Sequence, residues 1–308
     1  MIYLDYAATA PLGPLVLEAM MPYLEEHHGN ASSVHRYGQK AREAIDESRN
    51  FFMKTLGASL ARNIIFTGSG TESCNMGIFG AAFARQDQGK HLVLSAIEHP
   101  AVMEAAQHLE RAFDFELTLV KPDKEGLIHV EDVEAALRPD TILISVMLAN
   151  NEVGTVQPVK KIAKLARERG ILMHTDACQA PGFLDINADH LGVDLLSLNG
   201  SKVYGPKGIG LLFVREGVQI MPLIFGGGQE FRMRGGTENV ANIVGFARAM
   251  ELVLKDSKKE AQRIAEMRDE LLDALLKLPG VSVNGSRVHR LENNINLHVE
   301  GVSGETLV

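Results

Sequence analysis

The order of hydrophobic and polar positions along the chain predicts strands that alternate with helices. Short apolar runs rich in β-branched residues predict strands, and apolar residues at every third or fourth position predict helices. Short apolar strands separated by amphipathic helices indicate an α/β fold, with a mostly parallel sheet covered by helices on both faces. The predicted strands are residues 63–67, 92–95, 141–146, 171–174, 195–197 and 210–214, with helices at 72–84, 100–112 and 159–169.

The regions on either side of this alternation predict further helices. One face of residues 41–52 is apolar, and Gly57 is a candidate C-cap for that helix. Residues 241–278 predict one or two long helices, which end at the Pro-Gly pair 279–280. Two short strands are predicted after them, at residues 281–283 and 295–299.

The change from strand–helix alternation to helices and paired strands predicts a second, smaller domain. We assign residues 13–250 to a large α/β domain, and residues 1–12 and 251–308 to a small α+β domain. Two strands and the start of a helix at 304–308 are a small basis for an independent domain. We therefore expect the small domain to be incomplete and the sequence to be truncated.

Composition and charge narrow the class of protein. The 308 residues are 45% hydrophobic and 23% charged, as in a typical globular protein, and the length predicts about two domains. The net charge of −8 argues against a nucleic-acid surface, and no apolar run approaches the ~20 residues of a membrane span. The N-terminus lacks the pattern of a signal peptide, and two cysteines do not make a disulfide framework. These features predict a cytoplasmic protein.

An aspartate and a lysine follow two successive predicted strands. Asp176 lies just after the strand at 171–174, and Lys202 lies 26 residues further on. A lysine amine forms a Schiff base with an aldehyde, and an aspartate keeps a pyridine nitrogen protonated. Pyridoxal phosphate (PLP) chemistry needs both groups. Taken alone, a strand-end aspartate and a surface lysine are the more common interpretations of these two residues.

Two strand-to-helix junctions carry further candidates. Residues 67–72, Thr-Gly-Ser-Gly-Thr-Glu, place the amides near Gly70 and Thr71 and the Thr71 hydroxyl where they can hold a phosphate. The alternative is that Thr71 is only the N-cap of the helix. His99 lies at the next junction, where its ring can stack on a flat cofactor and relay protons, although a lone histidine is more often structural.

Polar residues also follow the other predicted strands. Residues 150–152, Asn-Asn-Glu, end the most apolar strand, where such groups are costly unless they form a surface turn or meet a polar ligand. Gln179 follows Asp176 by three residues and can hydrogen-bond a phenolic oxygen of the cofactor. The Gly-rich segment 226–239 predicts a contribution to an anion site or to a subunit contact.

Taken in order, these runs resemble a known family. They resemble the PLP-dependent cysteine desulfurases of the NifS/IscS type, which have the fold-type I, aminotransferase-like architecture of the PLP-dependent transferases. The resemblance covers essentially all of the 308 residues. The matching runs are residues 3–9, 29–35, 71–72, 98–99, 150–154, 176–179, 202–208 and 226–239.

The resemblance implies a role for each candidate residue. It implies that Lys202 is the Schiff-base lysine, that His99 stacks on the ring and that Asp176 pairs with the pyridine nitrogen. It also implies that Asn151 and Gln179 contact the ring substituents. The implied phosphate contacts are Gly70, Thr71, Asn199 and Ser201, with Thr237 of the partner subunit in a homodimer.

The resemblance also implies an activity. In this family, sulfur is removed from L-cysteine to leave L-alanine, and an enzyme persulfide passes the sulfur to an acceptor such as an iron–sulfur scaffold protein. Lys202 and His99 are the implied catalytic residues, and no metal is implied. Two alternatives stay open. One is another fold-type I PLP enzyme, such as a selenocysteine lyase or an aminotransferase, and the other is a non-catalytic remnant that acts as a scaffold.

Two features depart from the family pattern. Ser201 stands where the family has a histidine that contacts the phosphate. The family's nucleophilic cysteine and substrate-carboxylate arginine lie beyond the Gly-x-x-Gly-Glu segment, here residues 301–305, and so beyond Val308. The two cysteines present, Cys74 and Cys178, lie in a helix and at a strand end, where such residues usually pack. We therefore predict no catalytic role for either.

Overall fold

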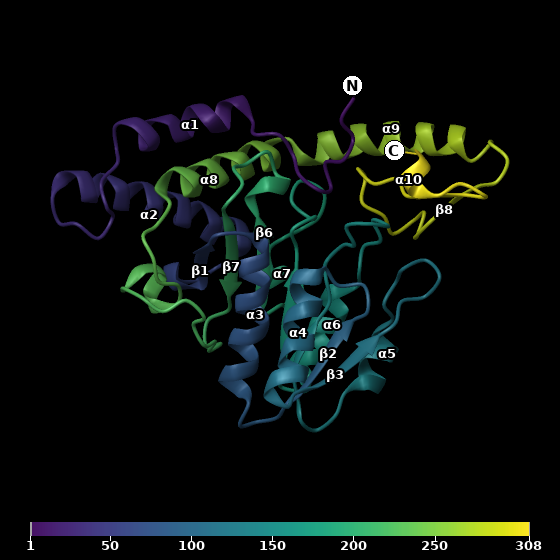
Figure 1. The fold of residues 1–308 in the computed structure, drawn as a ribbon, viewed down its shortest axis with the longest axis horizontal. Helices are drawn as coiled ribbons and strands as arrows, with labels where there is room; N and C mark the ends of the chain where they lie inside the picture. Colours follow the sequence, from purple (N-terminus) through teal and green to yellow (C-terminus); the bar gives the residue numbers. More distant parts are fainter. Residues whose placement is uncertain (1, 308) are drawn as a thin grey trace.

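Seven strands form one mixed sheet at the centre of the molecule (Figure 1). The computed structural model describes residues 2–307. Across the sheet the strand order is β1-β7-β6-β5-β4-β2-β3. The strands are β1 (Ile64–Thr67), β2 (His91–Ser95), β3 (Glu116–Val120), β4 (Thr141–Ser145), β5 (Leu172–Asp176), β6 (Leu195–Asn199) and β7 (Gly210–Val214).

The prediction of a mostly parallel sheet is confirmed. Strands β3, β2, β4, β5 and β6 run parallel to one another, and β7 is antiparallel to both β6 and β1. Only residues 200–209 connect β6 to β7. That connection is too short for the crossover of a dozen or more residues that a parallel pair requires. The sequence pattern missed β3, because this edge strand is largely exposed and only Val120 is buried.

Helices cover both faces of the sheet. On one face lie α3 (Gly70–Arg85) and α4 (Pro100–Phe113). On the other lie α2 (Arg36–Leu56), α6 (Val159–Glu168) and α8 (Val240–Lys255). The predicted helices are thereby confirmed, and Gly57 ends α2 with a φ of 71°, the left-handed conformation that glycine favours at a C-cap. The remaining helices are α1 (Pro14–Glu25), α5 (Val130–Ala136), α7 (Ala188–Leu191), α9 (Ser257–Leu275) and α10 (Gly304–Leu307).

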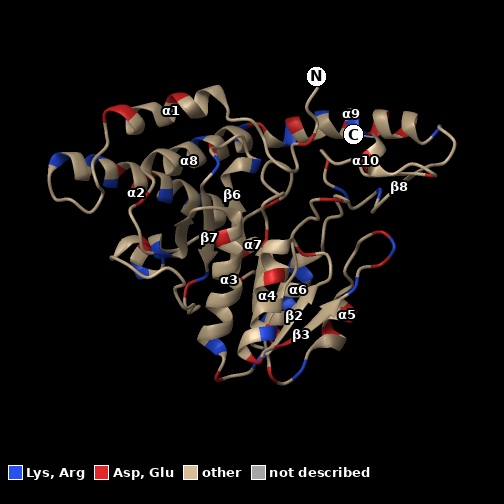
Figure 2. Ribbon diagram, in the orientation of Figure 1, with Lys and Arg blue, Asp and Glu red and all other residues tan. Residues whose placement is uncertain are grey.

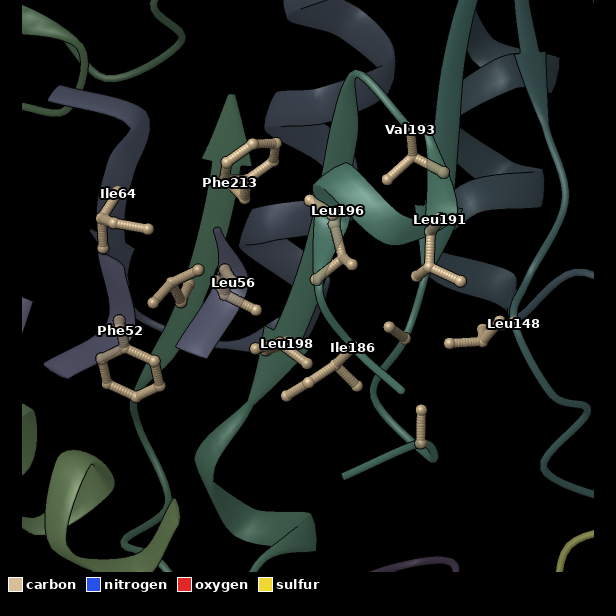
Figure 3. Close-up of a cluster of buried hydrophobic side chains, with 14 of the residues drawn as sticks. Phe52, Leu56, Ile64, Leu148, Ile186, Leu191, Val193, Leu196, Leu198 and Phe213 are labelled. Atoms are coloured by element: carbon tan, nitrogen blue, oxygen red, sulfur yellow. The ribbon is translucent and has the colours of Figure 1, made fainter. Parts of the chain in front are cut away.

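Successive residues of each strand enter different cores, because side chains alternate between the faces of a sheet. Ile64 lies in the core under α2, and its neighbour Ile65 lies in the core under α3. Figure 3 shows part of the first core, to which Phe52 and Leu56 of α2 contribute together with the sheet residues Ile64, Leu198 and Phe213. Burial of each such side chain contributes about 1.5–3 kcal/mol, so these two cores fix the positions of the strand ends.

The C-terminal strands form a separate two-stranded ribbon. β8 (Val281–Val283) and β9 (Leu297–Val299) pair antiparallel and lie beside α9 in Figure 1. A β-bridge between Thr155 and Arg290 ties this region to the segment after β4. The predicted domain boundary at residue 250 falls inside α8, whose residues Phe246 and Met250 are buried in the larger core. The division into two domains stays a prediction.

Charged side chains lie mainly around the periphery of the fold. Figure 2 shows both signs interspersed along α9, whereas β6 and β7 carry no charged residue. None of the described helices is long and apolar enough to cross a lipid bilayer. A few charged side chains lie inside the protein instead, and each needs a compensating partner.

Arg49 and Glu230 form such a buried pair. Arg49 is 2% exposed and Glu230 is 5% exposed. Two parallel hydrogen bonds join them, from Nη1 to Oε2 at 2.8 Å and from Nη2 to Oε1 at 2.7 Å. Oε2 also accepts a hydrogen bond from the amide of Phe66 on β1, at 2.9 Å. The Arg49 guanidinium lies over the rings of Phe66 and Phe231, 4.9 and 5.0 Å from their centroids.

This pair anchors the segment that connects β7 to α8. Glu230, Phe231 and Arg232 adopt positive φ angles of 43°, 57° and 67°. Such angles are unfavourable for residues with a side chain, and they persist only where surrounding contacts enforce them. The bidentate ion pair supplies that enforcement, because it holds the Glu230 side chain against α2 and β1 at the same time.

We expect Arg49→Met to lower the free energy of unfolding by about 3–5 kcal/mol, because it leaves a buried carboxylate without its partner. Urea denaturation followed by circular dichroism measures the change. Arg263→Met is the matched control, since Arg263 pairs with Glu260 on the exposed side of α9, and it should leave stability nearly unchanged. Equal midpoints for the two variants would contradict an anchoring role for Arg49.

Candidate active site

A cavity of about 490 Å³ opens where the C-terminal ends of β4, β5 and β6 meet the N-terminal ends of α3 and α4. Ligands of open α/β sheets bind at this edge, because the connections leave the strands there and diverge. Eight of the ten predicted site residues line the cavity. They are Gly70, Thr71, His99, Asn151, Asp176, Gln179, Asn199 and Lys202.

The other two predicted site residues lie outside this lining. Ser201 is adjacent to it, but its hydroxyl donates to Oδ1 of Asn199 at 3.1 Å, which also accepts from the Ser201 amide. Thr237 is exposed in the segment between β7 and α8. Within one chain, therefore, neither Ser201 nor Thr237 contributes to the cavity wall.

The N-terminus of α3 supplies the predicted phosphate contacts. Ser69 is the N-cap, because its hydroxyl accepts from the Glu72 amide at 3.0 Å, which corrects the alternative that Thr71 caps the helix. The amides of Gly70 and Thr71 belong to the first turn, which has no intrahelical acceptors, and the helix dipole adds positive potential there. A Cβ atom on Gly70 would lie 3.0 Å from Cβ of Asn199, so only glycine lets the two segments approach so closely.

Asp176 is the last residue of β5 and is 6% exposed. Its Oδ1 accepts from the Cys178 amide at 2.9 Å, and its Oδ2 accepts from the Cys74 thiol at 3.6 Å. Within residues 2–307, no lysine, arginine or histidine forms an ion pair with it. A buried carboxylate without a cation is costly, so this side of the cavity is suited to a positively charged group of a ligand.

His99 is held by the helix that it begins. Its Nδ1 accepts a hydrogen bond from the Ala101 amide at 3.0 Å, and Pro100 occupies the first position of α4. Because Nδ1 accepts, the proton of a neutral ring must lie on Nε2. The backbone therefore fixes both the position and the tautomer of His99 at the cavity wall.

The two adjacent asparagines have different functions. Asn150 is buried and shapes the turn: its Oδ1 accepts from the amides of Glu152 and Val153, and its Nδ2 donates to the carbonyl of Ile97. Asn151 lines the cavity. The turn alternative therefore holds for Asn150, although the turn is buried rather than at the surface, and the ligand alternative remains for Asn151.

Lys202 lies under the N-terminal segment of the chain. Its Nζ donates to the carbonyls of Ala7 and Ala8, at 2.6 and 2.5 Å, and Gln179 Nε2 donates to the same Ala7 carbonyl at 2.9 Å. Asp5, Ala7 and Ala8 form part of the cavity wall. We did not predict these contacts, although residues 3–9 belong to the runs that carry the family resemblance. Only their position over Lys202 reveals them as cavity residues.

Both cysteines line the cavity as protonated thiols. Burial, followed by the charge of Asp176, raises the pKa of Cys74 and of Cys178 well above the usual value. A thiolate is the nucleophilic form of cysteine. The environment of these two residues thus disfavours nucleophilic chemistry, as expected for packing residues.

Glu98, next to His99, is a buried acid that sequence reasoning missed. It is 8% exposed, and its Oε1 accepts from the Ser95 hydroxyl and from the Met147 amide. Burial raises its pKa to about 8, although these hydrogen bonds and Ser145 lower it. Below that pH the carboxyl is neutral, and it joins the end of β2 to the segment after β4.

The cavity residues fit PLP. The free amides at the start of α3 suit its phosphate, the unpaired Asp176 carboxylate suits its pyridine nitrogen, and the Lys202 amine suits its aldehyde. The imidazole of His99 offers a flat surface for the ring. The missing counter-ion of Asp176 is a feature that such a ligand explains.

The chain belongs to the class-V aminotransferase family, which matches residues 2–308. Among curated relatives, a cysteine desulfurase IscS of Dictyoglomus turgidum is 48% identical over 308 residues, which are all of this chain and 78% of the relative. The IscS of Methanosarcina thermophila is 45% identical over 307 residues, 100% of this chain and 76% of the relative.

Solved structures agree. A NifS-like protein superposes with a TM-score of 0.96 at 35% identity, over 99% of this chain and 84% of that one. A structure described as SspA in complex with cysteine gives a TM-score of 0.89 at 40% identity, over 97% of this chain and 84% of that one. These similarities confirm the predicted family, the fold class and the dependence on PLP.

The raised pKa of Glu98 predicts a loss of stability at alkaline pH. Between the unfolded value of 4.5 and the folded value of about 8, the folded state binds one proton more than the unfolded state. Stability therefore falls as pH rises, by up to about 1.4 kcal/mol per pH unit. Folded His174 has its pKa lowered to about 4 and opposes this trend only below 6.5, so it does not mask the effect of Glu98 between pH 6.5 and 8.

We expect urea midpoints of the unaltered protein to fall between pH 6.5 and 8, and those of Glu98→Gln to stay level. Glu134→Gln is the control, because Glu134 is exposed and pairs with Arg169. Parallel curves for all three proteins would show that Glu98 is already ionised at neutral pH.

Proposed function

We propose that this chain acts as a PLP-dependent cysteine desulfurase, which removes sulfur from L-cysteine and leaves L-alanine. The observation that carries the proposal is the meeting of Lys202, Asp176 and His99 at one cavity, in a chain that matches cysteine desulfurases along its whole length. The relative solved with cysteine supports the substrate. The chain-wide match favours this activity over a selenocysteine lyase or an aminotransferase.

In this proposal the residues divide into those that hold the cofactor and those that move protons. Bound PLP supplies an electron sink for the amino acid and an aldehyde for the lysine amine. Asp176 would pair with the pyridine nitrogen, and Asn151 and Gln179, which also line the cavity, would contact the ring substituents. Gly70, Thr71 and Asn199, which line the cavity, would hold the phosphate, whereas the hydroxyl of Ser201 is bonded to Asn199.

Lys202 and His99 are the proposed proton carriers. Lys202 must first leave the carbonyls of Ala7 and Ala8, which hold its amine in this structure. His99 keeps Nδ1 occupied by the Ala101 amide, so only its Nε2 is free to give or take a proton. Because the backbone fixes that nitrogen, it would give or take the proton at a constant position on the cavity wall.

A homodimer and a sulfur acceptor are the finer parts of the proposal. The segment before α8 exposes Phe225 and Phe231, at 79% and 46%, although its backbone is anchored by Glu230. That exposed apolar surface supports contact with a second copy of the chain, which would supply Thr237 to the phosphate. The acceptor would be a protein such as an iron–sulfur scaffold. A cytoplasmic location is supported by the two free thiols.

Added PLP should turn the purified protein yellow, and borohydride reduction should attach the label to the peptide that contains Lys202. Mass spectrometry of a digest locates the label. Lys207→Ala should behave like the unaltered protein, because Lys207 is an exposed lysine of the same connection, whereas Lys202→Ala should lose the label. Labelling of any other lysine would refute the assignment.

Cys74 and Cys178 should not be the residues that accept sulfur from L-cysteine, so alanine production should not depend on either of them. The cofactor contacts of the chain permit a change in the absorbance of bound PLP when the amino acid enters. Neither Cys74 nor Cys178 is a thiolate at neutral pH, because burial raises both pKa values. Alanine and sulfide released under reductant are the quantities to measure. Robust alanine production that disappears in Cys178→Ala or Cys74→Ala would overturn this expectation.

A further inference from the structure

The connection between β8 and β9 contacts one wall of the cavity but has no part in the roles proposed above. We call residues 150–154 the cavity turn, because two of them line the cavity. We call residues 284–296 the ribbon connection, because they join β8 to β9. We propose, resting on the cofactor function above, that two residues of the ribbon connection, Arg290 and Asn294, are positioning residues for Asn151 in the cavity turn.

Two side-chain amides of the ribbon connection converge on one carbonyl of the cavity turn. Nδ2 of Asn294 and Nδ2 of Asn296 each donate to the carbonyl of Glu152, both at 3.0 Å. A carbonyl oxygen has two lone pairs, so these two donors use its full accepting capacity. The peptide unit that follows Glu152 is therefore fixed from the side of the ribbon.

Backbone hydrogen bonds hold the end of the cavity turn. The Leu291 amide donates to the carbonyl of Gly154 at 2.9 Å, and the Val156 amide donates to the carbonyl of His289 at 2.8 Å. Gly154 has a φ of 72°, and a Cβ atom at this position would lie 2.5 Å from Cγ of Asn294. Glycine thus lets the ribbon connection pack directly onto the turn.

Arg290 determines which way the Asn294 amide faces. Nη1 of Arg290 donates to Oδ1 of Asn294 at 2.7 Å. A guanidinium has donors only, so the amide must present its oxygen to Arg290. The amide nitrogen then faces the Glu152 carbonyl, which can only accept. A reversed amide would set donor against donor at Arg290 and acceptor against acceptor at Glu152.

The guanidinium of Arg290 is buried among neutral acceptors. Arg290 is 6% exposed, and it also donates to the carbonyls of Ser286, at 2.8 Å, and of Asn284. Burial, followed by the charge of Arg268, lowers its pKa. Because burial of a charge is unfavourable, the guanidinium contributes more to the orientation of its acceptors than to stability.

The last link to the cavity is Glu152, which is held at both of its peptide groups. Its amide donates to Oδ1 of Asn150 at 3.0 Å, and its carbonyl accepts from the ribbon connection. Oε1 of Glu152 accepts from Nδ2 of Asn151 at 2.8 Å. A carboxylate only accepts, so the Asn151 amide must turn its nitrogen toward Glu152. Oδ1 of Asn151 is then left to accept from a ligand.

The hydrogen bonds from Arg290 to Asn151 therefore each have a single direction. Arg290 donates to Asn294, Asn294 donates to the Glu152 carbonyl, and Asn151 donates to the Glu152 carboxylate. If either residue of the ribbon connection is replaced, Glu152 loses an orienting donor. The Asn151 side chain then has no fixed orientation at the cavity wall.

Hydrogen exchange of the unaltered protein without PLP tests the contact between the two segments. The Leu291 amide, which donates to Gly154, should exchange at least about tenfold more slowly than the amide of its exposed neighbour Asn293. Equal rates would show that the ribbon connection does not hold the turn and would overturn the proposal. This readout stands even if the protein fails to bind PLP, an outcome that would instead refute the proposed function.

The side-chain amide of Asn151 reports its own orientation. In ¹H–¹⁵N spectra of the protein without PLP, the signal of this amide is identified by its absence from Asn151→Ala. It should shift in Arg290→Met and in Asn294→Leu, because both substitutions disturb the donor to Glu152. Asn294 is only half-buried, so Asn294→Leu remains informative even if Arg290→Met fails to fold.

PLP affinity, followed by the absorbance of the bound cofactor, tests the effect on the cavity. We expect Arg290→Met and Asn294→Leu each to lower affinity on the order of fivefold, as for the loss of one hydrogen bond. In an Asn151→Ala background, neither substitution should lower affinity further, because the side chain through which they act is absent. An equal fall in both backgrounds would show that the two residues only stabilise the fold, and would overturn the proposal.

Arg287 offers a matched control within the ribbon connection. It pairs with Asp273 at the surface, with 3.0 Å between Nη2 and Oδ1. Arg287→Met removes the same charge as Arg290→Met, and it should leave both the Asn151 signal and PLP affinity unchanged. If Arg290→Met and Asn294→Leu behave like Arg287→Met, the ribbon connection does not position Asn151.

Discussion

The main constraint on the cavity is the unfavourable free energy of burying the Asp176 carboxylate without a cation. Asp176 is almost fully enclosed at the end of β5, and its protein partners are an amide and a thiol. A fold tolerates such a charge only where neutral donors surround it and where a ligand can complete it. The neighbouring acid Glu98 is neutral, and the neighbouring imidazole of His174 is uncharged. The compensating positive charge must therefore be carried by a group that is bound in the cavity.

The short connection between β6 and β7 explains why a lysine lies at the same place. Residues 200–209 leave no room for a crossover helix, so β7 returns antiparallel and the connection remains at the C-terminal edge of β6. Lys202 is therefore confined to the edge where β5 ends in Asp176. The first turn of α3 reaches this edge as well, because Gly70 has no Cβ atom and can therefore lie close to Asn199. Sheet topology thereby brings an acid, an amine and free amides together.

Sequence patterns predicted the interior of this arrangement better than its boundary. Apolar runs located β1, β4 and β7 almost to the residue, because burial on both faces leaves a continuous hydrophobic signal. The edge strand β3 lacks that signal. Eight of the ten predicted site residues share the cavity, since strand ends and helix starts converge in any parallel sheet. The covering segment at Ala7 and Ala8 was not predicted, because it acts through backbone carbonyls, which every residue type provides.

The two buried histidines show a further limit of sequence reasoning. His91 and His174 each lie in a strand, each is fully buried, and each bridges two hydroxyls. The two histidines differ in their positions in the sheet. His174 lies on the same face of β5 as Asp176, near the end of the strand that borders the cavity, whereas His91 is the first residue of β2, at the opposite ends of the strands. The cross-strand neighbours of a buried histidine decide which hydroxyls it bridges, and those neighbours are distant in sequence. The chemistry of a buried polar residue is therefore set by sheet pairing, which only the folded structure reveals.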